Sequence, residues 1–142
     1  MTDIVIDFDG TCVTHEFPEI GKDIGAQRVL KKLVERGHRL ILFTMRSDNG
    51  SLPLFTVAGI ENVRGDFLTQ AVEWFEKNEI PLFGIQENPE QKSWTNSPKA
   101  YGQIIIDDSA LGCPLTYVYG RRPYVDWESV ESMLKLKGLI HA

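Results

Sequence analysis

Short apolar runs alternate along the chain with longer segments in which apolar residues recur at helical spacing. The middle runs are apolar at successive positions, a pattern typical of parallel strands that are covered on both faces. The runs predict strands at residues 4–8, 39–44, 82–86, 103–108 and 116–120. Most of these strands are therefore expected inside a parallel sheet.

The segments between the runs predict helices at residues 24–37, 66–80 and 126–138. Gly37 is expected to end the first helix, because glycine readily adopts the left-handed conformation that closes a helix. Asp66 and Asp126 are the expected N-caps of the other two, since a carboxylate accepts bonds from the free N–H groups of a first turn. The expected inward-facing residues are Ile24, Val29, Leu30, Leu33 and Val34 in the first helix and Phe67, Val72 and Phe75 in the second.

The order of the predicted elements, β-α-β-α-β-β-β-α, indicates an α/β protein. We expect a doubly wound, Rossmann-like sheet of about five mainly parallel strands, with helices on both faces and hence three layers. A chain of 142 residues buries roughly two thirds of its unfolded surface, which is enough for one core. Residues 1–142 are therefore expected to form a single domain.

Two of the predicted connections, residues 45–65 and 87–102, are long. Loops of this length without regular structure are uncommon in compact domains and often carry function. We expect each of them to help wall a site, and neither is long enough to fold as a second domain.

The charge of the chain limits its partners. There are 20 acidic and 15 basic residues, and the basic ones are scattered, which argues against non-specific binding to nucleic acid or to an anionic membrane. A small anionic substrate stays compatible with this charge if a metal or a few local cations attract it. No apolar run approaches the roughly 18 residues of a membrane span, and no secretion signal is evident. We expect a cytoplasmic protein with no membrane partner, in which Cys12 and Cys113 are reduced.

Polar side chains gather where the predicted strands end. Asp7 and Asp9 end the first strand, Thr44 ends the second, and Asp107 and Asp108 end the fourth. The carboxyl ends of parallel strands lie at one edge of the sheet, where ligands bind in this class of fold. A cluster of oxygen ligands without cysteine or histidine spacing suits a hard cation, and Mg²⁺ fits better than Zn²⁺.

Four short motifs carry a resemblance to a known family. They are "DFDGT" after the first strand, the threonine of "ILFTMRS", the lysine of "SPKAYG" and the acidic pair of "IIIDD". In this order they resemble the signature motifs of the haloacid dehalogenase (HAD) superfamily of phosphotransferases, and the resemblance spans Asp3 to Tyr119. It implies a HAD-like hydrolase fold of the phosphatase type.

The resemblance also implies a role for each matching residue. Asp7 would be the nucleophile that forms an aspartyl-phosphate, and Asp9 the general acid and base. Thr44 and Lys99 would hold phosphate oxygens, although Lys92 competes with Lys99 for the lysine role. The Mg²⁺ ligands would be Asp7, the backbone carbonyl of Asp9, and Asp107 or Asp108, between which the sequence does not choose.

Residues near these motifs complete the expected site. Gly10 lets the chain turn after Asp9, and the Thr11 hydroxyl can hold a neighbouring carboxylate. Gly10, Thr11 and Arg46 are expected at the substrate, and His15 is a weaker candidate because a surface role suits it as well. The residues left outside the expected site are Trp94, Tyr101, Arg121 and Arg122.

The lengths between the motifs leave no room for a large cap domain, so the chain resembles the capless members of the superfamily. The expected activity is Mg²⁺-dependent hydrolysis of a phosphomonoester. An open site suits a phosphorylated macromolecule end, or a small molecule if a second subunit of a homo-oligomer closes over the rim. Two alternatives are a receiver-like phospho-acceptor domain, which the order of the motifs disfavours, and a non-catalytic metal- and phosphate-binding protein, which the intact Asp7 and Asp9 disfavour.

Overall fold

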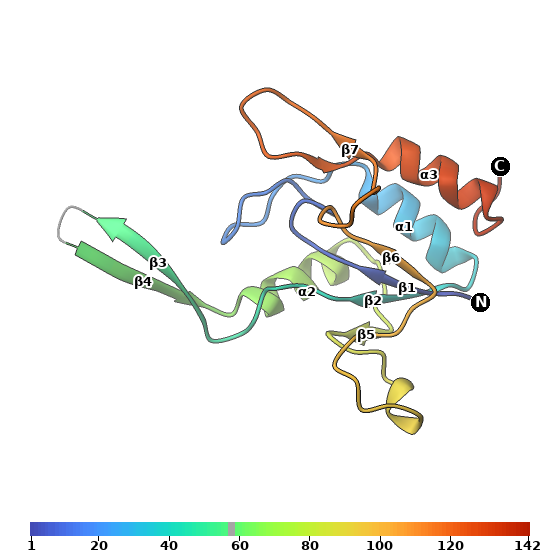
Figure 1. Cartoon of the computed structure of the whole chain (residues 1–142), viewed down its shortest axis with the longest axis horizontal. Helices are drawn as coiled ribbons and strands as arrows, with labels where there is room; N and C mark the ends of the chain where they lie inside the picture. The colour runs from blue at the N-terminus through green and yellow to red at the C-terminus, as the bar shows by residue number, and fades with distance from the viewer. Residues whose placement is uncertain (57–58) are drawn as a thin grey trace.

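The computed structural model describes residues 1–56 and 59–142, without the side chains of residues 52–63. Its centre is a four-stranded sheet in which every pair of neighbouring strands is parallel (Figure 1). In spatial order the strands are β5 (Gly84–Ile85), β2 (Arg39–Leu42), β1 (Asp3–Ile6) and β6 (Ile104–Ile106). The protein is therefore an α/β protein, and its parallel sheet is consistent with a Rossmann-like architecture.

The direction of winding reverses at β1. From β1 the chain proceeds to β2 and β5 on one side, and β6 then returns to the other side of β1. Ile6 lies opposite Ile106, and the Asp7 N–H donates to the Ile106 carbonyl at 3.0 Å, so the two strands end together. In open α/β sheets the crevice beyond such a reversal is the usual ligand site.

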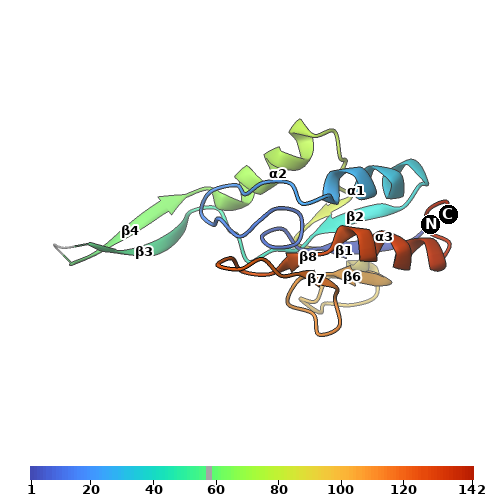
Figure 2. The ribbon, with the colours of Figure 1, turned by 90° about the horizontal axis from the view of Figure 1, so that it is seen from above.

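All three helices pack into one core. They are α1 (Ala26–Glu35), α2 (Phe67–Lys77) and α3 (Trp127–Leu136). Their buried residues join Ile4, Ile6, Leu40 and Leu42, which point to the same face of the sheet. Figure 2 shows α1 and α2 on that side. Each fully buried leucine or isoleucine contributes roughly 1.5–3 kcal/mol of transfer free energy, so this core is the main stabilising element.

The opposite face carries a loop where the sequence predicts a helical layer. Val5 and Ile41 are covered there by Ala100 and by the partly buried Phe83. The connection from β5 to β6 crosses this face and contains only the short 3-10 helix η1 (Gln91–Ser93). The prediction of helices on both faces is thus wrong, because the segment 87–102 has no apolar stripe and docks through polar contacts instead.

Those contacts lie at the amino end of the sheet. Asn88 donates to the Asp3 carboxylate at 3.0 Å, and Arg39 bridges Asp3 at 2.7 Å and Glu90 at 2.8 Å. The segment 87–102 therefore lies against the end of the sheet opposite to Asp7, and the expectation that it walls the site is not met.

The fifth predicted strand, 116–120, is not part of the main sheet. Only β7 (Leu115–Thr116) is a strand there, and it pairs with β8 (Tyr124–Val125) in a separate antiparallel pair. Tyr117 and Tyr119 are exposed and Gly120 has a φ of +77°, so the chain turns where the apolar pattern predicts a strand. The number of strands in the main sheet is therefore four.

The long segment 45–65 contains a hairpin that the sequence analysis does not predict. Its strands, β3 (Gly50–Thr56) and β4 (Gly59–Gly65), are antiparallel and project from the body as an arm (Figures 1 and 2). Proline and glycine interrupt the alternation here, which hides a strand from pattern analysis but is tolerated at sheet edges.

Two further expectations concern the cysteines and the membrane. Cys12 and Cys113 are both free thiols. Within the described residues, no helix combines the length and the apolar character that crossing a membrane requires.

The N-caps of α2 and α3 differ. Asp126 accepts bonds from the N–H groups of Glu128 at 3.2 Å and Ser129 at 3.3 Å, as predicted. Asp66 precedes α2 as predicted but forms no such bond, and its carboxylate accepts instead from the Asn49 N–H at 3.0 Å. Asp48, from the preceding loop, accepts from the Thr69 N–H at 2.8 Å and takes the capping role.

This difference gives a stability prediction. Asp126→Ala should lower the free energy of unfolding by about 1 kcal/mol, the usual cost of a lost N-cap. The matched substitution Asp66→Ala should have a clearly smaller effect, because no helical N–H loses its partner. Urea denaturation followed by circular dichroism measures both, and equal losses would contradict the assignment of the caps.

Candidate functional site

Asp7 is the first residue after β1 and is only partly exposed, although its carboxylate faces the crevice. The Thr11 hydroxyl donates to its Oδ2 at 2.8 Å, as the sequence predicts. Burial, followed by the negative charge of Asp107, raises the pKa of Asp7 to about 8. Without a cation, this carboxyl therefore keeps its proton at neutral pH.

Asp7, Asp107 and Asp108 form an acidic cluster in which one oxygen from each lies within 4.8 Å of the others. The Ser109 N–H holds Asp107 at 2.8 Å, and His15 Nε2 lies 2.9 Å from Asp108 Oδ2. The donor set is entirely carboxylate oxygen, which fits a hard divalent cation. Burial is the main cause of the raised pKa of Asp7, and the negative charge of Asp107 raises it further.

The turn after Asp9 brings these side chains together. Gly10 has a φ of +79°, and a Cβ at this position would collide with His15 Nε2 and with the Asp108 carboxylate. The turn is also tied to the end of the chain, because Val125 N–H donates to the Gly10 carbonyl at 2.9 Å and Trp127 Nε1 donates to the Thr11 carbonyl at 2.7 Å. Only glycine leaves room here for the contact between His15 and Asp108.

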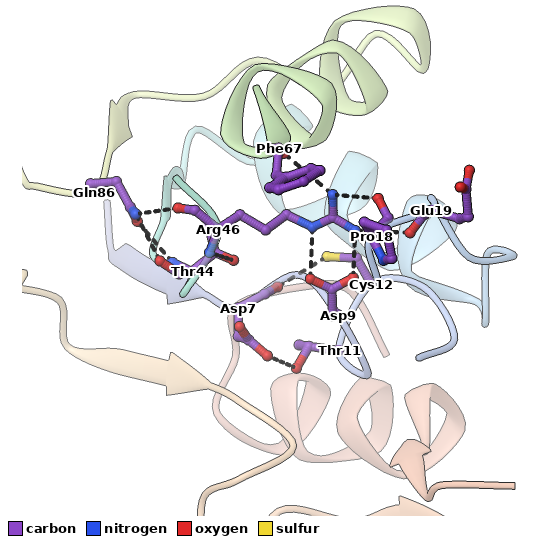
Figure 3. A network of polar contacts seen from close by, with 10 residues as sticks. All are labelled: Asp7, Asp9, Thr11, Cys12, Pro18, Glu19, Thr44, Arg46, Phe67 and Gln86. Atoms are coloured by element: carbon purple, nitrogen blue, oxygen red, sulfur yellow. Dashed lines mark hydrogen bonds and ion pairs between the residues drawn. The ribbon is translucent and has the colours of Figure 1, made fainter. Parts of the chain in front are cut away.

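Asp9 faces away from this cluster and binds Arg46 (Figure 3). Arg46 Nε donates to Asp9 Oδ2 at 2.7 Å, and Nη2 donates to Oδ1 at 2.8 Å, so the pair is bidentate. The Asp9 carboxylate is consequently not part of the acidic cluster. The resemblance assigned the metal contact to its backbone carbonyl, and that expectation stays open.

Arg46 itself is buried, with 2% of its surface exposed. Besides Asp9, it donates to the carbonyls of Glu19 at 2.9 Å, Phe67 at 3.3 Å and Pro18 at 3.4 Å. The guanidinium thus joins the turn after β1, the segment before α1 and the first turn of α2 (Figure 3). Its donors are committed to the protein, so the sequence-based expectation of a substrate contact gives way to a structural role.

Thr44 lies at the end of β2, as predicted, and Gln86 holds its backbone. The Gln86 side chain accepts from the Thr44 N–H at 2.8 Å and donates to the Thr44 carbonyl at 2.7 Å, which imitates a neighbouring strand. The Thr44 hydroxyl accepts from the Arg46 N–H at 3.2 Å and keeps its own proton to donate. The sequence gives no signal for Gln86, since its contact depends on a φ of +64° after β5.

A cavity of about 370 Å³ unites these groups. It is lined by the predicted residues Asp7, Asp9, Thr44, Arg46, Asp107 and Asp108. His15 and Arg122 also line it, together with Phe17, Met45 and Ser109. Arg122 lies outside the site that the sequence predicts, because nothing in the pattern places residues 117–123 near β1.

The two candidate lysines do not reach this cavity. Lys99 is exposed on the segment 87–102 and is not among the lining residues. Lys92 is also exposed and pairs with Glu87 at 3.5 Å. The spacing to β6 favours Lys99 in the sequence, but the loop that carries it docks at the amino end of the sheet.

Comparison with known proteins gives one informative match. A solved structure of a conserved protein from Bacteroides thetaiotaomicron superposes with a TM-score of 0.67 at 30% sequence identity. The match covers 96% of this chain and 91% of that one. The chain belongs to the same family as that protein. No protein-family model and no curated protein matches the sequence, so the function of the family has to be argued from the site.

The burial of Arg46 leads to a prediction about stability. Arg46→Ala would leave the Asp9 carboxylate without its partner and should lower the free energy of unfolding by about 3 kcal/mol. The exposed Arg36 provides a matched control, because Arg36→Ala should cost less than about 0.5 kcal/mol. Chemical denaturation measures both, and equal stability of the two variants would show that the pair contributes nothing.

The raised pKa of Asp7 predicts a dependence of stability on pH. The folded pKa of about 8 lies above the unfolded value, so the metal-free protein is favoured at low pH and loses this stability as the pH rises from about 4 to about 8. The slope for a single group is at most about 1.4 kcal/mol per pH unit. Asp7→Asn should remove this contribution. Thermal melts of both proteins in EDTA should therefore give melting temperatures that draw together toward pH 4 and separate toward pH 8. Parallel curves would contradict the raised pKa.

Proposed function

We propose that the protein is a divalent-metal-dependent phosphomonoester hydrolase of the HAD type, which acts through a phosphorylated Asp7. The observation that carries the proposal is the position of Asp7. Its carboxylate lies at the reversal of the sheet, in the same crevice as Asp107, Asp108 and the Thr44 hydroxyl. This set supplies a nucleophile, metal ligands and a hydrogen-bond donor for the phosphate from the ends of three separate strands.

The acidic cluster would hold the metal, for which we propose Mg²⁺ because every donor is oxygen. Asp7 and Asp107 are the better candidates for direct ligands, since Asp108 already uses Oδ2 with His15. Asp107 uses only Oδ1, for the Ser109 N–H. When bound, the ion neutralises charge on the phosphate and on Asp7, whose high pKa otherwise leaves it protonated and unable to attack.

The chemistry proceeds by two displacements at phosphorus. An Asp7 oxygen forms a bond to phosphorus while the bond to the ester oxygen breaks, and the departing oxygen takes the electron pair and then a proton. Water next attacks the phosphorus of the aspartyl-phosphate, the bond to Asp7 breaks, and inorganic phosphate leaves. The net reaction consumes one water and releases an alcohol and phosphate.

Thr44 and Asp9 have separate duties in these steps. The Thr44 hydroxyl donates to a phosphate oxygen, and its backbone is held for that purpose by Gln86. Asp9 is proposed to protonate the leaving oxygen and to accept the proton of the attacking water. Since both of its oxygens accept from Arg46, Asp9 has to give up one of these bonds before it donates a proton.

Activity assays test this proposal directly. With Mg²⁺, the protein should release phosphate from p-nitrophenyl phosphate, and EDTA should abolish the release. Asp7→Asn should lower kcat by at least about a thousandfold, because no other group replaces the nucleophile. Asp9→Asn should form the aspartyl-phosphate with this good leaving group and then stall, which mass spectrometry of the quenched protein would show as an added phosphoryl group. Asp66→Asn, the same change outside the site, should retain activity.

Two results would overturn the proposal. If Asp7→Asn turns over as wild type does, the nucleophile is another residue. If wild type binds Mg²⁺ but releases no phosphate from a broad panel of esters, the protein is the non-catalytic binder that the same acidic cluster would also serve.

A further inference from the structure

The loop between β7 and β8, residues 117–123, stands beside the acidic cluster and has no part in the proposed chemistry. It is seen in Figure 1 as the long turn that leaves β7. Its base is held firmly, because β8 donates from Val125 to Gly10 and Asp126 N–H donates to the Pro114 carbonyl at 2.9 Å. The loop is therefore anchored to the same turn that positions Asp7 and Thr11.

The loop brings two arginines to the site. Arg122 lines the cavity that contains Asp7 and Asp107. Arg122 and Arg121 also line a second cavity of about 230 Å³, together with His15 and the acidic Glu16. Because His15 and Arg122 belong to both cavities, the two hollows adjoin and lead from the acidic cluster to Arg121. Arginine is always charged and binds phosphate through two parallel N–H groups.

The same loop exposes two tyrosines without a packing role. Tyr119 is fully exposed and Tyr117 is 76% exposed. Single exposed aromatic residues are common, but two tyrosines and two arginines within six residues offer flat apolar faces next to positive charges. This combination is the one that binds bases by stacking and their phosphates by charge.

We propose that the leaving group is a phosphate-linked nucleotide, which the loop 117–123 recognises. Arg122 contacts the phosphate that is transferred, Arg121 contacts the next phosphate along, and Tyr117 or Tyr119 stacks on a base. This assignment rests on the proposed function, and it supplies the cation at the cavity that neither Lys99 nor Lys92 provides. The nucleotide is either a free nucleoside 3′,5′-bisphosphate or the phosphorylated end of a short single strand.

The charge of the whole chain limits the length of this contact. With a net charge of −5, the protein repels a long polyanion, and only two arginines lie in the loop to oppose this. Recognition therefore extends over one or two nucleotides. A phosphopeptide fits the loop less well, because it offers neither a second phosphate at a fixed spacing nor a base to stack.

Competing substrates test the assignment. The ratio of kcat/KM for a phosphorylated tetranucleotide to that for p-nitrophenyl phosphate should fall about tenfold in Arg121→Gln and in either Tyr117→Ala or Tyr119→Ala, as expected for one lost phosphate contact or stacking contact. The control substitutions Arg36→Gln and Tyr101→Ala, which change the same residue types outside the site, should keep the wild-type ratio. Nucleoside 3′,5′-bisphosphate as a third substrate shows which of the two sources is preferred.

A binding measurement separates this inference from the proposed function. Asp7→Asn with Mg²⁺ should bind a fluorescent, phosphorylated tetranucleotide, and adding Arg121→Gln should weaken the binding about tenfold in fluorescence anisotropy. If the nucleotide binds in this way but wild type does not turn it over, the result would support nucleotide recognition by the loop 117–123 and reject the proposed hydrolase activity. Unchanged ratios in the loop variants, or a phosphoserine peptide that is preferred to the nucleotides, would overturn the inference.

Discussion

The close approach of three carboxylates where β1 and β6 end is the constraint around which this protein is arranged. Asp7, Asp107 and Asp108 are brought together because β1 and β6 end side by side, and no cation among the described side chains pairs with Asp7. The Thr11 hydroxyl, the Ser109 N–H and His15 each hold one of these groups in place. The three carboxylates lie close enough together to hold a cation between them, which is the basis of the metal site proposed above.

Asp7 and Asp9 are one residue apart and have opposite environments. Asp7 has no positive partner and is half-buried among acids, so its pKa is raised to about 8. Each carboxylate oxygen of Asp9 accepts a hydrogen bond from the buried guanidinium of Arg46. The two residues point in different directions from the end of β1, and this divergence lets one strand end carry two carboxylates in different electrostatic environments.

The sequence predicts the parts of this arrangement that depend on local pattern. Apolar runs identify the four strands of the main sheet, and the acidic residues that follow them identify the cluster. The prediction fails where position depends on contacts between distant segments. Arg46 looks like a surface residue beside Thr44 until the carbonyls of Glu19 and Phe67 surround it. Lys99 has the right spacing before β6, but spacing does not reveal that its loop is held by Asp3 and Arg39 at the other end of the sheet.

The hydrogen bonds from Val125 to Gly10 and from Trp127 to Thr11 connect β8 and the start of α3 to the turn after β1. A polypeptide is made from its N-terminus, so the turn after β1 is synthesised long before the residues that brace it. While the chain is still growing, Asp7 has no β6 beside it and the turn has no support from β8 or α3. The acidic cluster therefore comes together only after β6 has been made, and its supporting turn is braced only when β8 and α3 follow.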